Sequence, residues 1–107
     1  REMALIATRV RPDGRPETLG VVRAVGDADN VNAEFAVVIR SDWHQRGLGQ
    51  MLMDRIIRYC RRRGTRRLLG QTLASNTAMQ ALARHFGFKS STPSAGVVNL
   101  ELPLMGG

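Results

Sequence analysis

The sequence feature that most constrains the fold is a change of hydrophobic period around the glycine pair Gly47 and Gly49. The segment before it, residues 34–40, is the most continuously apolar part of the chain, which is typical of a central strand buried on both faces. From Leu48 onward apolar residues recur about every 3.6 positions, as in an amphipathic helix that Gly64 would end. A strand, a glycine-containing turn and a long helix therefore follow one another here.

Shorter apolar segments and clusters of turn residues place the other elements around this unit. We expect strands at residues 3–10, 19–25, 67–73 and 96–104, and a shorter helix between residues 75 and 86. A helix between the third and fourth strands implies a parallel pair joined by a right-handed crossover, whereas the other pairs can be antiparallel. The predicted class is mixed α/β. The inner stripe of the long helix is expected to contain Leu48, Met51, Leu52, Ile56, Tyr59 and Cys60.

Length and composition narrow the class of protein. A chain of 107 residues suits one domain, and because it starts at Arg1 directly in a predicted strand, we expect a piece of a longer protein. No apolar run approaches the roughly 20 residues of a membrane span, and no signal peptide is recognisable. The single cysteine, Cys60, cannot form an internal disulfide and is expected to be buried rather than nucleophilic. These features predict a cytoplasmic protein without a membrane partner.

The net charge of +7 favours an anionic partner but does not identify it. Residues 61–63, with Arg66 and Arg67, form an arginine run that is either a solvated helix end or a docking surface for an acidic partner or a cofactor phosphate. No aromatic platform or nucleic-acid motif accompanies it, so nucleic acid is not the expected partner. The sequence also has no metal-ligand cluster, and we expect no metal cofactor.

Residues 41–49, between the central strand and the long helix, have the character of an anion site. A helix N-terminus exposes unpaired N–H groups, and glycines let a phosphate approach the backbone closely. Arg46 adds a positive charge that can pair with phosphate oxygens. The pattern lacks the third glycine of dinucleotide-binding turns and the Lys-Ser/Thr of triphosphate loops. A tight turn with no ligand remains the alternative, but the end of a parallel strand favours a phosphate-bearing cofactor.

The turn Gln45–Gly49 resembles the Q/R-x-x-G-x-G/A signature of the GNAT acetyltransferases. Asn76 followed by residues 81–88 is similar to the second helix of that family and its Gly-Phe ending, so the resemblance covers essentially the whole chain. It implies the GNAT fold, a mixed and largely antiparallel sheet with a splayed parallel pair and flanking helices, here without the family's N-terminal strand and two helices. Residues 1–4 and 27–42 resemble the bacterial Pat-type protein-lysine acetyltransferases. Residues 1–107 are then a single GNAT domain, expected to be the C-terminal fragment of a longer protein.

The resemblance implies acetyl-CoA as cosubstrate and a set of residues that bind it. The backbone of residues 38–40 is expected to pair with the pantetheine arm, an N–H near Val38 to stabilise the oxyanion, and the turn to bind the pyrophosphate. Asn76 either caps its helix or hydrogen-bonds the cofactor, or does both. The expected cofactor-binding residues are Val38, Ile39, Arg40, Gln45, Arg46, Gly47, Leu48, Gly49, Gln50 and Asn76.

Glu34 is the candidate general base, by its position in the Pat-type enzymes and as the only acid of an otherwise apolar segment. A lysine acceptor has a pKa near 10.4, so it must lose a proton before attacking a thioester. The alternative is a solvated glutamate at a strand end. Ala83 occupies the position where many GNAT enzymes carry a tyrosine acid, so no general acid is assigned. His44 and His85 are expected to be exposed residues without a defined role, although His44 lies in the phosphate turn.

The predicted function is acetyl transfer from acetyl-CoA to a lysine of a protein, with an acyl-CoA synthetase-type target suggested by the resemblance. Two alternatives remain open at this point. One is a small-amine N-acetyltransferase, and the other is a module that senses acetyl-CoA without turnover. The missing N-terminal elements and Ala83 favour the second alternative modestly.

Overall fold

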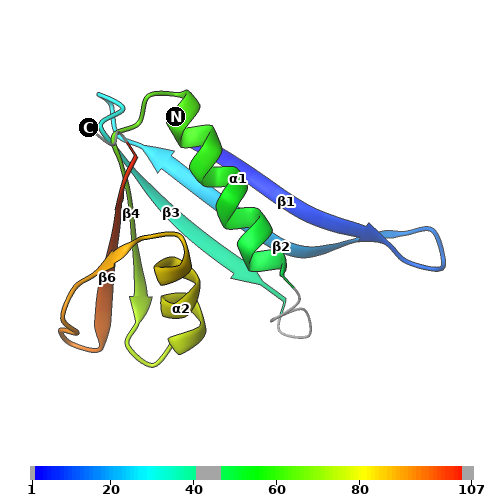
Figure 1. The fold of residues 1–107 in the computed structure, drawn as a ribbon. Helices are drawn as coiled ribbons and strands as arrows, with labels where there is room; N and C mark the ends of the chain where they lie inside the picture. The colour runs from blue at the N-terminus through cyan, green and yellow to red at the C-terminus, as the bar shows by residue number, and fades with distance from the viewer. Residues whose placement is uncertain (1, 41–46, 105–107) are drawn as a thin grey trace.

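The computed structural model describes residues 2–40 and 47–104, and within them two helices lie on one face of a six-stranded sheet (Figure 1). The predicted site residues Gln45 and Arg46, and also His44, lie outside the described residues. The elements in chain order are β1 (Glu2–Val10), β2 (Pro16–Gly26), β3 (Asn32–Ile39), α1 (Leu48–Arg62), β4 (Arg67–Leu73), α2 (Thr77–His85), β5 (Lys89–Ser90) and β6 (Val97–Pro103).

The sheet has the order β1-β2-β3-β4-β6-β5, in which β3 and β4 are parallel and every other neighbouring pair is antiparallel. The predicted mixed α/β class and the parallel pair joined by the long helix are therefore confirmed. Strand β5 was not predicted, because two residues are too few to show a hydrophobic period. No helix in residues 2–40 or 47–104 is long and apolar enough to cross a membrane.

Strand β3 is central, as predicted, but the expectation that it is buried on both faces is wrong. Ala33 and Phe35 are buried under the helices, whereas the alternate residues point to the other face, where Val38 is 68% exposed. In the described part of the chain no helix covers that face (Figure 1). An apolar run shows only that both faces of a strand are hydrophobic. It does not show that a second layer of helices or strands covers the other face of the sheet.

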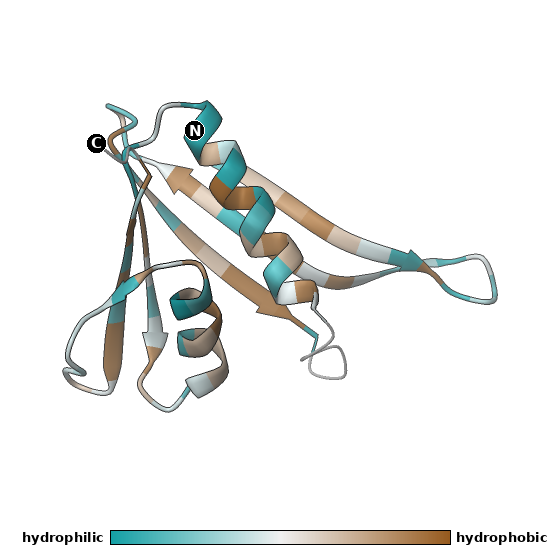
Figure 2. Ribbon diagram, viewed as in Figure 1, coloured by the Kyte–Doolittle hydropathy of each residue, from teal (hydrophilic) through white to brown (hydrophobic). Residues whose placement is uncertain are grey.

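Helix α1 starts after Gly47 and ends before Gly64, both of which have φ of +79°, as the glycine positions predicted. Its outer face is polar and its inner face apolar (Figure 2). The predicted rotation was partly wrong, because Met51 is 45% exposed while Met53 and Ile57 are buried. Residues 51–53 are all apolar, so periodicity cannot choose among them, and packing selects Met53.

A hydrogen-bonded clasp fixes the end of the sheet at which β3 and β4 pair. Asn30, in the left-handed region with φ of 56°, donates from Nδ2 to the carbonyl of Arg63 at 2.7 Å. The hydroxyl of Thr65, which is 2% exposed, donates to Oδ1 of Asn30 at 2.8 Å. The β2–β3 turn is thereby tied to the connection between α1 and β4, which fixes where the two parallel strands start.

Candidate active site

The site is built around a fork between the two parallel strands (Figure 1). Strands β3 and β4 pair only at Asn32–Arg67, Ala33–Leu68 and Glu34–Leu69. Beyond this point β3 continues beside β2, and β4 continues beside β6. An opening therefore lies between them, and Glu34 belongs to the last residue pair before it.

Phe35 and Gly70 would form the next pair, and their packing explains why a glycine is needed at this point. A Cβ atom on Gly70 would lie 2.7 Å from Cζ and 3.0 Å from Cδ1 of Phe35, and would also overlap Cε1. The Phe35 ring lies across this strand and packs on Phe88, with ring centroids 5.3 Å apart. At the closed end of the fork, the Phe35 ring therefore packs directly on the backbone of Gly70.

The orientation of the β3 peptide groups decides which residues face the fork. The Arg40 amide donates to the Leu19 carbonyl at 2.8 Å, and so faces β2. Peptide groups alternate along a strand, so those of Val38 face β2 as well, and those of Val37 and Ile39 face the opening. Of the three residues predicted to pair with pantetheine through their backbone, only Ile39 turns its peptide groups toward the opening, together with Val37, which was not predicted. The side chain of Arg40 is itself bound to Glu17 at 3.0 Å.

The first turn of α1 presents backbone donors at the open end of the fork. Gly47 caps the helix without a side-chain hydrogen bond, and the amide of Met51 is the first to bond within the helix, to the Gly47 carbonyl at 3.1 Å. The preceding N–H groups have no carbonyl of their own helix to bind, so this end attracts anions. A Cβ on Gly49 would approach Ile39 Cδ1 to 3.1 Å and Leu82 Cδ2 to 3.2 Å, so this glycine lets the turn lie close to both neighbours.

A cavity of about 460 Å³ lies between this turn and α2, and it collects most of the described residues predicted to bind the cofactor. Leu48 is the exception among the turn residues, because its side chain is 7% exposed and belongs to the core. Val37 and His85 line the cavity but were not predicted; the helical spacing of residues 78, 81, 82 and 85 could have indicated His85. The lining residues are Val37, Ile39, Gly47, Gly49, Gln50, Asn76, Ala78, Met79, Ala81, Leu82 and His85.

Two further hollows lie along the fork, and each shares lining residues with its neighbour. The second, of about 360 Å³, shares Val37, Asn76 and Met79 with the first. The third, of about 660 Å³, lies around Glu34 and shares Phe35 and Ala36 with the second. Three hollows, each sharing lining residues with the next, therefore lie in series from the first turn of α1 to Glu34.

Glu34 is exposed at the closed end of the fork, and its neighbours leave it available. Asp27 accepts the amides of Val31 and Asn32, at 2.9 and 3.2 Å, and the carboxylate of Glu2 lies 3.8 Å from the guanidinium of Arg23. The side chain of Glu34 has no hydrogen bond or ion pair with any residue in 2–40 or 47–104. Among the described residues, the carboxylate of Glu34 is therefore unpaired and lies beside the opening between β3 and β4.

Asn76 is confirmed as the N-cap of α2, since its Oδ1 accepts the Met79 amide at 3.0 Å. Its Nδ2 group has no partner within the described ranges and remains able to donate into the cavity. Ala83 is fully buried and provides no acid. Tyr59 accepts a hydrogen bond from Arg63 at 3.0 Å on the opposite helix, so it does not replace the missing tyrosine.

The described residues offer neither an exposed thiol nor a cluster of metal ligands. Cys60 is 3% exposed, and burial raises the pKa of its thiol, which leaves it a poor nucleophile. Among residues 2–40 and 47–104 no three His, Cys, Asp or Glu side chains gather into a possible metal site.

Comparison with known proteins agrees with this geometry. The chain is 33% identical over 88 residues to an acetyltransferase of Pseudomonas aeruginosa, an alignment that covers 82% of this chain and 47% of that protein. The chain thus spans about half the length of this curated relative. The GNAT domain of PAT from S. lividans superposes with a TM-score of 0.81 at 26% identity, over 95% of this chain and 60% of that one. Protein yncA of Salmonella typhimurium, solved with acetyl-CoA, superposes with a TM-score of 0.72 at 22% identity, over 81% and 58%.

These matches confirm the predicted GNAT fold, with its parallel pair β3–β4, its otherwise antiparallel sheet and its two helices. The family match itself spans residues 4–88, from β1 across both helices to Phe88. This range contains the fork, the first turn of α1 and Glu34. The chain belongs to the Acetyltransferase (GNAT) family.

Proposed function

We propose that the protein transfers an acetyl group from acetyl-CoA to a lysine ε-amine of another protein. The observation that carries the proposal is the series of adjoining hollows along the fork, with the amides of the first α1 turn at one end and the exposed carboxylate of Glu34 at the other. The pantetheine arm of acetyl-CoA can then enter the fork from one face of the sheet, and an acceptor amine can approach the thioester from the other face.

The residues present fit acetyl-CoA on the helix side of the sheet. Backbone groups of Val37 and Ile39 face the fork, where an extended pantetheine arm resembles a strand, and Nδ2 of Asn76 donates from α2. The amides of the first α1 turn meet the pyrophosphate. The predicted contribution of Gln45 and Arg46 belongs to this proposal too. Reversing the charge with Arg46→Glu is expected to weaken acetyl-CoA binding in calorimetry, and unchanged affinity would contradict the phosphate assignment.

Glu34 acts as the general base on the open face. It removes a proton from the lysine ammonium, directly or through a water, because the amine attacks only in its neutral form. A C–N bond then forms as the C–S bond breaks, and CoA leaves as a thiolate. Thiol pKa values lie near 8.5, so this leaving group needs no acid, consistent with the buried Ala83.

The acceptor assignment rests on exposure and on resemblance. Glu34 and its surroundings lie on a sheet face that no described helix covers, which a side chain on a protein surface can approach. The likeness to the PAT GNAT domain, at 26% identity, supports the Pat-type reading with a protein-lysine acceptor and a C-terminal position in a longer chain. A cytoplasmic location, with a reducing environment suited to a lone cysteine, is part of the same proposal.

The test is acetyl transfer by the wild type, Glu34→Gln and a matched control, Glu101→Gln, on β6 in the same cross-strand row. Acyl-CoA synthetases and polyamines serve as acceptors, in the longest natural chain that contains this domain. Loss of a general base lowers turnover by roughly 10²–10⁴-fold, with acetyl-CoA affinity unchanged. The control is expected to keep its rate.

Each other outcome favours a different function. Acetylation of polyamines alone would identify a small-amine acetyltransferase. Tight acetyl-CoA binding without turnover on any acceptor would identify a sensing module. A Glu34→Gln variant with full activity would remove Glu34 from the mechanism.

A further inference from the structure

Arginines gather in the C-terminal half of α1 and at the start of β4, and the function proposed above gives them no role. Residues 55–67 contain seven arginines and no acid, and all seven arginines are exposed. We call this set the arginine rim; it consists of the arginine run together with Arg55 and Arg58. We propose that the arginine rim binds acidic side chains that lie beside the acceptor lysine on the acceptor protein, an inference that rests on the proposed function.

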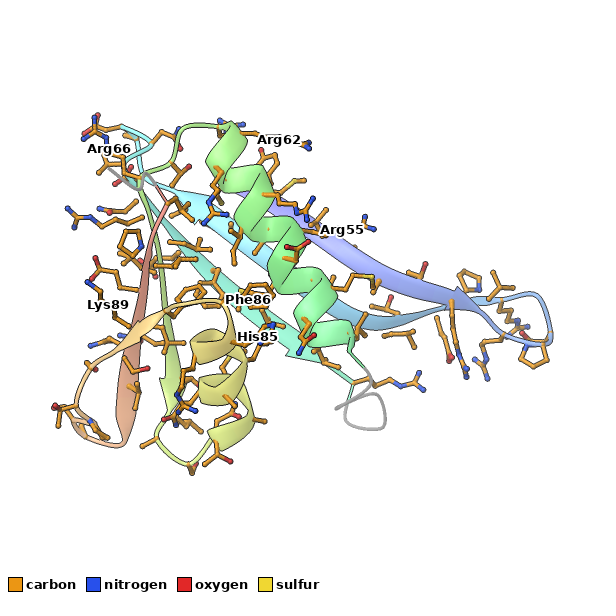
Figure 3. All side chains as sticks on the ribbon, viewed as in Figure 1. Arg55, Arg62, Arg66, His85, Phe86 and Lys89 are labelled. Atoms are coloured by element: carbon orange, nitrogen blue, oxygen red, sulfur yellow. The ribbon has the colours of Figure 1, made fainter. Side chains whose placement is uncertain are left out.

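Most of the arginine rim is free to bind a partner. Within the described residues three of its side chains have contacts at 3.0–4.0 Å, which are Arg58–Asp54, Arg63–Tyr59 and Arg67–Glu101. The other four have no hydrogen bond or ion pair from their side chains to any residue in 2–40 or 47–104, and they are Arg55, Arg61, Arg62 and Arg66. Figure 3 shows Arg55 and Arg62 along α1, and Arg66 at the end of the sheet where α1 leads into β4. The described part of the fold therefore does not use these four charges.

The arginine rim reaches the end of the sheet at which Glu34 lies. Arg67 pairs with Asn32 across the parallel strands, and Glu34 follows Asn32 by two residues, about 7 Å along the strand. Leu68 is fully buried under the helices, so its neighbours Arg67 and Leu69 point to the same uncovered face as Glu34. A protein bound to the arginine rim is thus in position to present a lysine to Glu34.

The charge changes sign between the arginine rim and the hollow around Glu34. Glu2, Asp27 and Glu34 line that hollow, and Arg23, which also lines it, lies 3.8 Å from the carboxylate of Glu2. A lysine ammonium suits the acidic hollow, whereas carboxylates suit the arginine rim. A nucleic acid or an anionic membrane presents phosphates to both, and the acids of the hollow would repel them. A protein surface can carry a lysine next to acids, so it matches both regions.

Other roles for the arginines fit the geometry less well. The arginine run starts at Arg61, near the far end of the 15-residue α1 and about 20 Å from its first turn by helical rise, so it does not meet the phosphates of a cofactor bound there. The ring of Tyr59 is half-buried, and the guanidinium of Arg63 lies over it at 5.6 Å from the centroid. This ring therefore does not offer the free stacking face that a single-stranded nucleic acid needs.

Acetyl transfer to two synthetic peptides tests the inference, in the longest natural chain that contains this domain. Both peptides carry one lysine, which is flanked by three glutamates in the first and by three glutamines in the second. The wild type is expected to show a KM about tenfold lower for the glutamate peptide, with a similar kcat, because exposed ion pairs add affinity and do not enter the chemical step. The preference should weaken as salt is added, since salt screens exposed charges.

The double variant Arg62→Ala/Arg66→Ala removes two unpaired charges of the arginine rim. It should raise the KM for the glutamate peptide about fivefold and leave the kcat, and the KM for the glutamine peptide, unchanged. The matched control is Arg15→Ala/Arg84→Ala, which removes the same charge from two exposed side chains that lie outside the arginine rim and have no side-chain partner among the described residues. This control is expected to keep the preference of the wild type.

The remaining outcomes would overturn the inference. Equal KM values of the wild type for the two peptides would exclude acidic docking, and an equal loss in the control would show an effect of net charge instead of a defined surface. Inhibition by duplex DNA or by phosphatidylserine vesicles that disappears in Arg62→Ala/Arg66→Ala, without a peptide preference, would assign the arginine rim to a nucleic acid or a membrane. Transfer to neither peptide would refute the proposed function itself, whereas transfer to both without preference would refute only the docking.

Discussion

Replacing Gly70 with alanine tests whether the fork depends on the contact with Phe35. The added Cβ would lie 2.7 Å from Cζ of Phe35, closer than carbon atoms pack without displacement. Gly70 has no positive φ, so alanine is compatible with the backbone and only the collision matters. Overpacking of a core typically costs about 1–3 kcal/mol, and we expect the upper part of that range because the ring is 8% exposed and is held by Phe88.

The control is the same substitution in a Phe35→Ala background. Phe35→Ala alone is expected to cost about 3–5 kcal/mol through the cavity it leaves. In that background Gly70→Ala has no ring to displace, so its effect should fall to nearly zero or become slightly stabilising, by up to about 1 kcal/mol, because alanine has less freedom than glycine in the unfolded chain. Urea unfolding of the four proteins gives the free energies of unfolding and their coupling.

A coupling of about 2–3 kcal/mol between the two positions would support the packing account of the fork. If Gly70→Ala cost the same with and without the Phe35 ring, the collision would not be its cause and the reasoning would be refuted. Acetyl-CoA affinity, measured on the same proteins, should fall in Gly70→Ala, because the displaced ring closes the fork between β3 and β4.

Three further changes test other parts of the structure. Hydrogen bonds from Arg9 and Arg40 hold the pKa of Glu17 below its usual value of 4.5, so its carboxylate stabilises the fold above the unfolded-state pKa and ceases to do so as the pH falls through the lower native value. Urea unfolding should find Glu17→Gln less stable than the wild type at pH 7 and equal to it in strong acid; a gap that persists in acid would contradict this. Gly49→Ala should weaken acetyl-CoA binding in calorimetry by moving the first turn of α1 away from its neighbours, and an affinity equal to the wild type's would count against the turn as the phosphate site. Thr65→Val removes a buried hydroxyl from the clasp and should cost about 1–3 kcal/mol, whereas an unchanged thermal midpoint would show that the clasp contributes nothing.

Much of the candidate site was predictable from sequence because its signals are local. A helix start at Gly47 and an N-cap at Asn76 depend on residues within one helical turn, and both are present. The prediction for Glu34 came from its place in the strand and from family resemblance, and the structure places it at the end of the strand pairing. Its role as a base stays a prediction.

Other features were out of reach because they depend on packing between elements. The apolar run of β3 gave no sign that one face stays uncovered, and consecutive apolar residues around Leu52 hid the rotation of α1. Val37 instead of Val38 faces the fork because of its register with β2, which a sequence does not show. His85 is exposed, as predicted, and only the approach of α2 to the first turn of α1 shows that it also lines a cavity.

The sequence by itself determined the order of all elements except β5, the parallel crossover and the helix start after Gly47, since hydrophobic period and turn chemistry act over a few residues. Only the tertiary structure decided where β3 and β4 separate. At that point the ring of Phe35 meets the backbone of Gly70, two residues far apart in the chain that the crossover through α1 brings together. The fork begins at this contact between distant elements, so its position follows from packing and not from a local sequence signal.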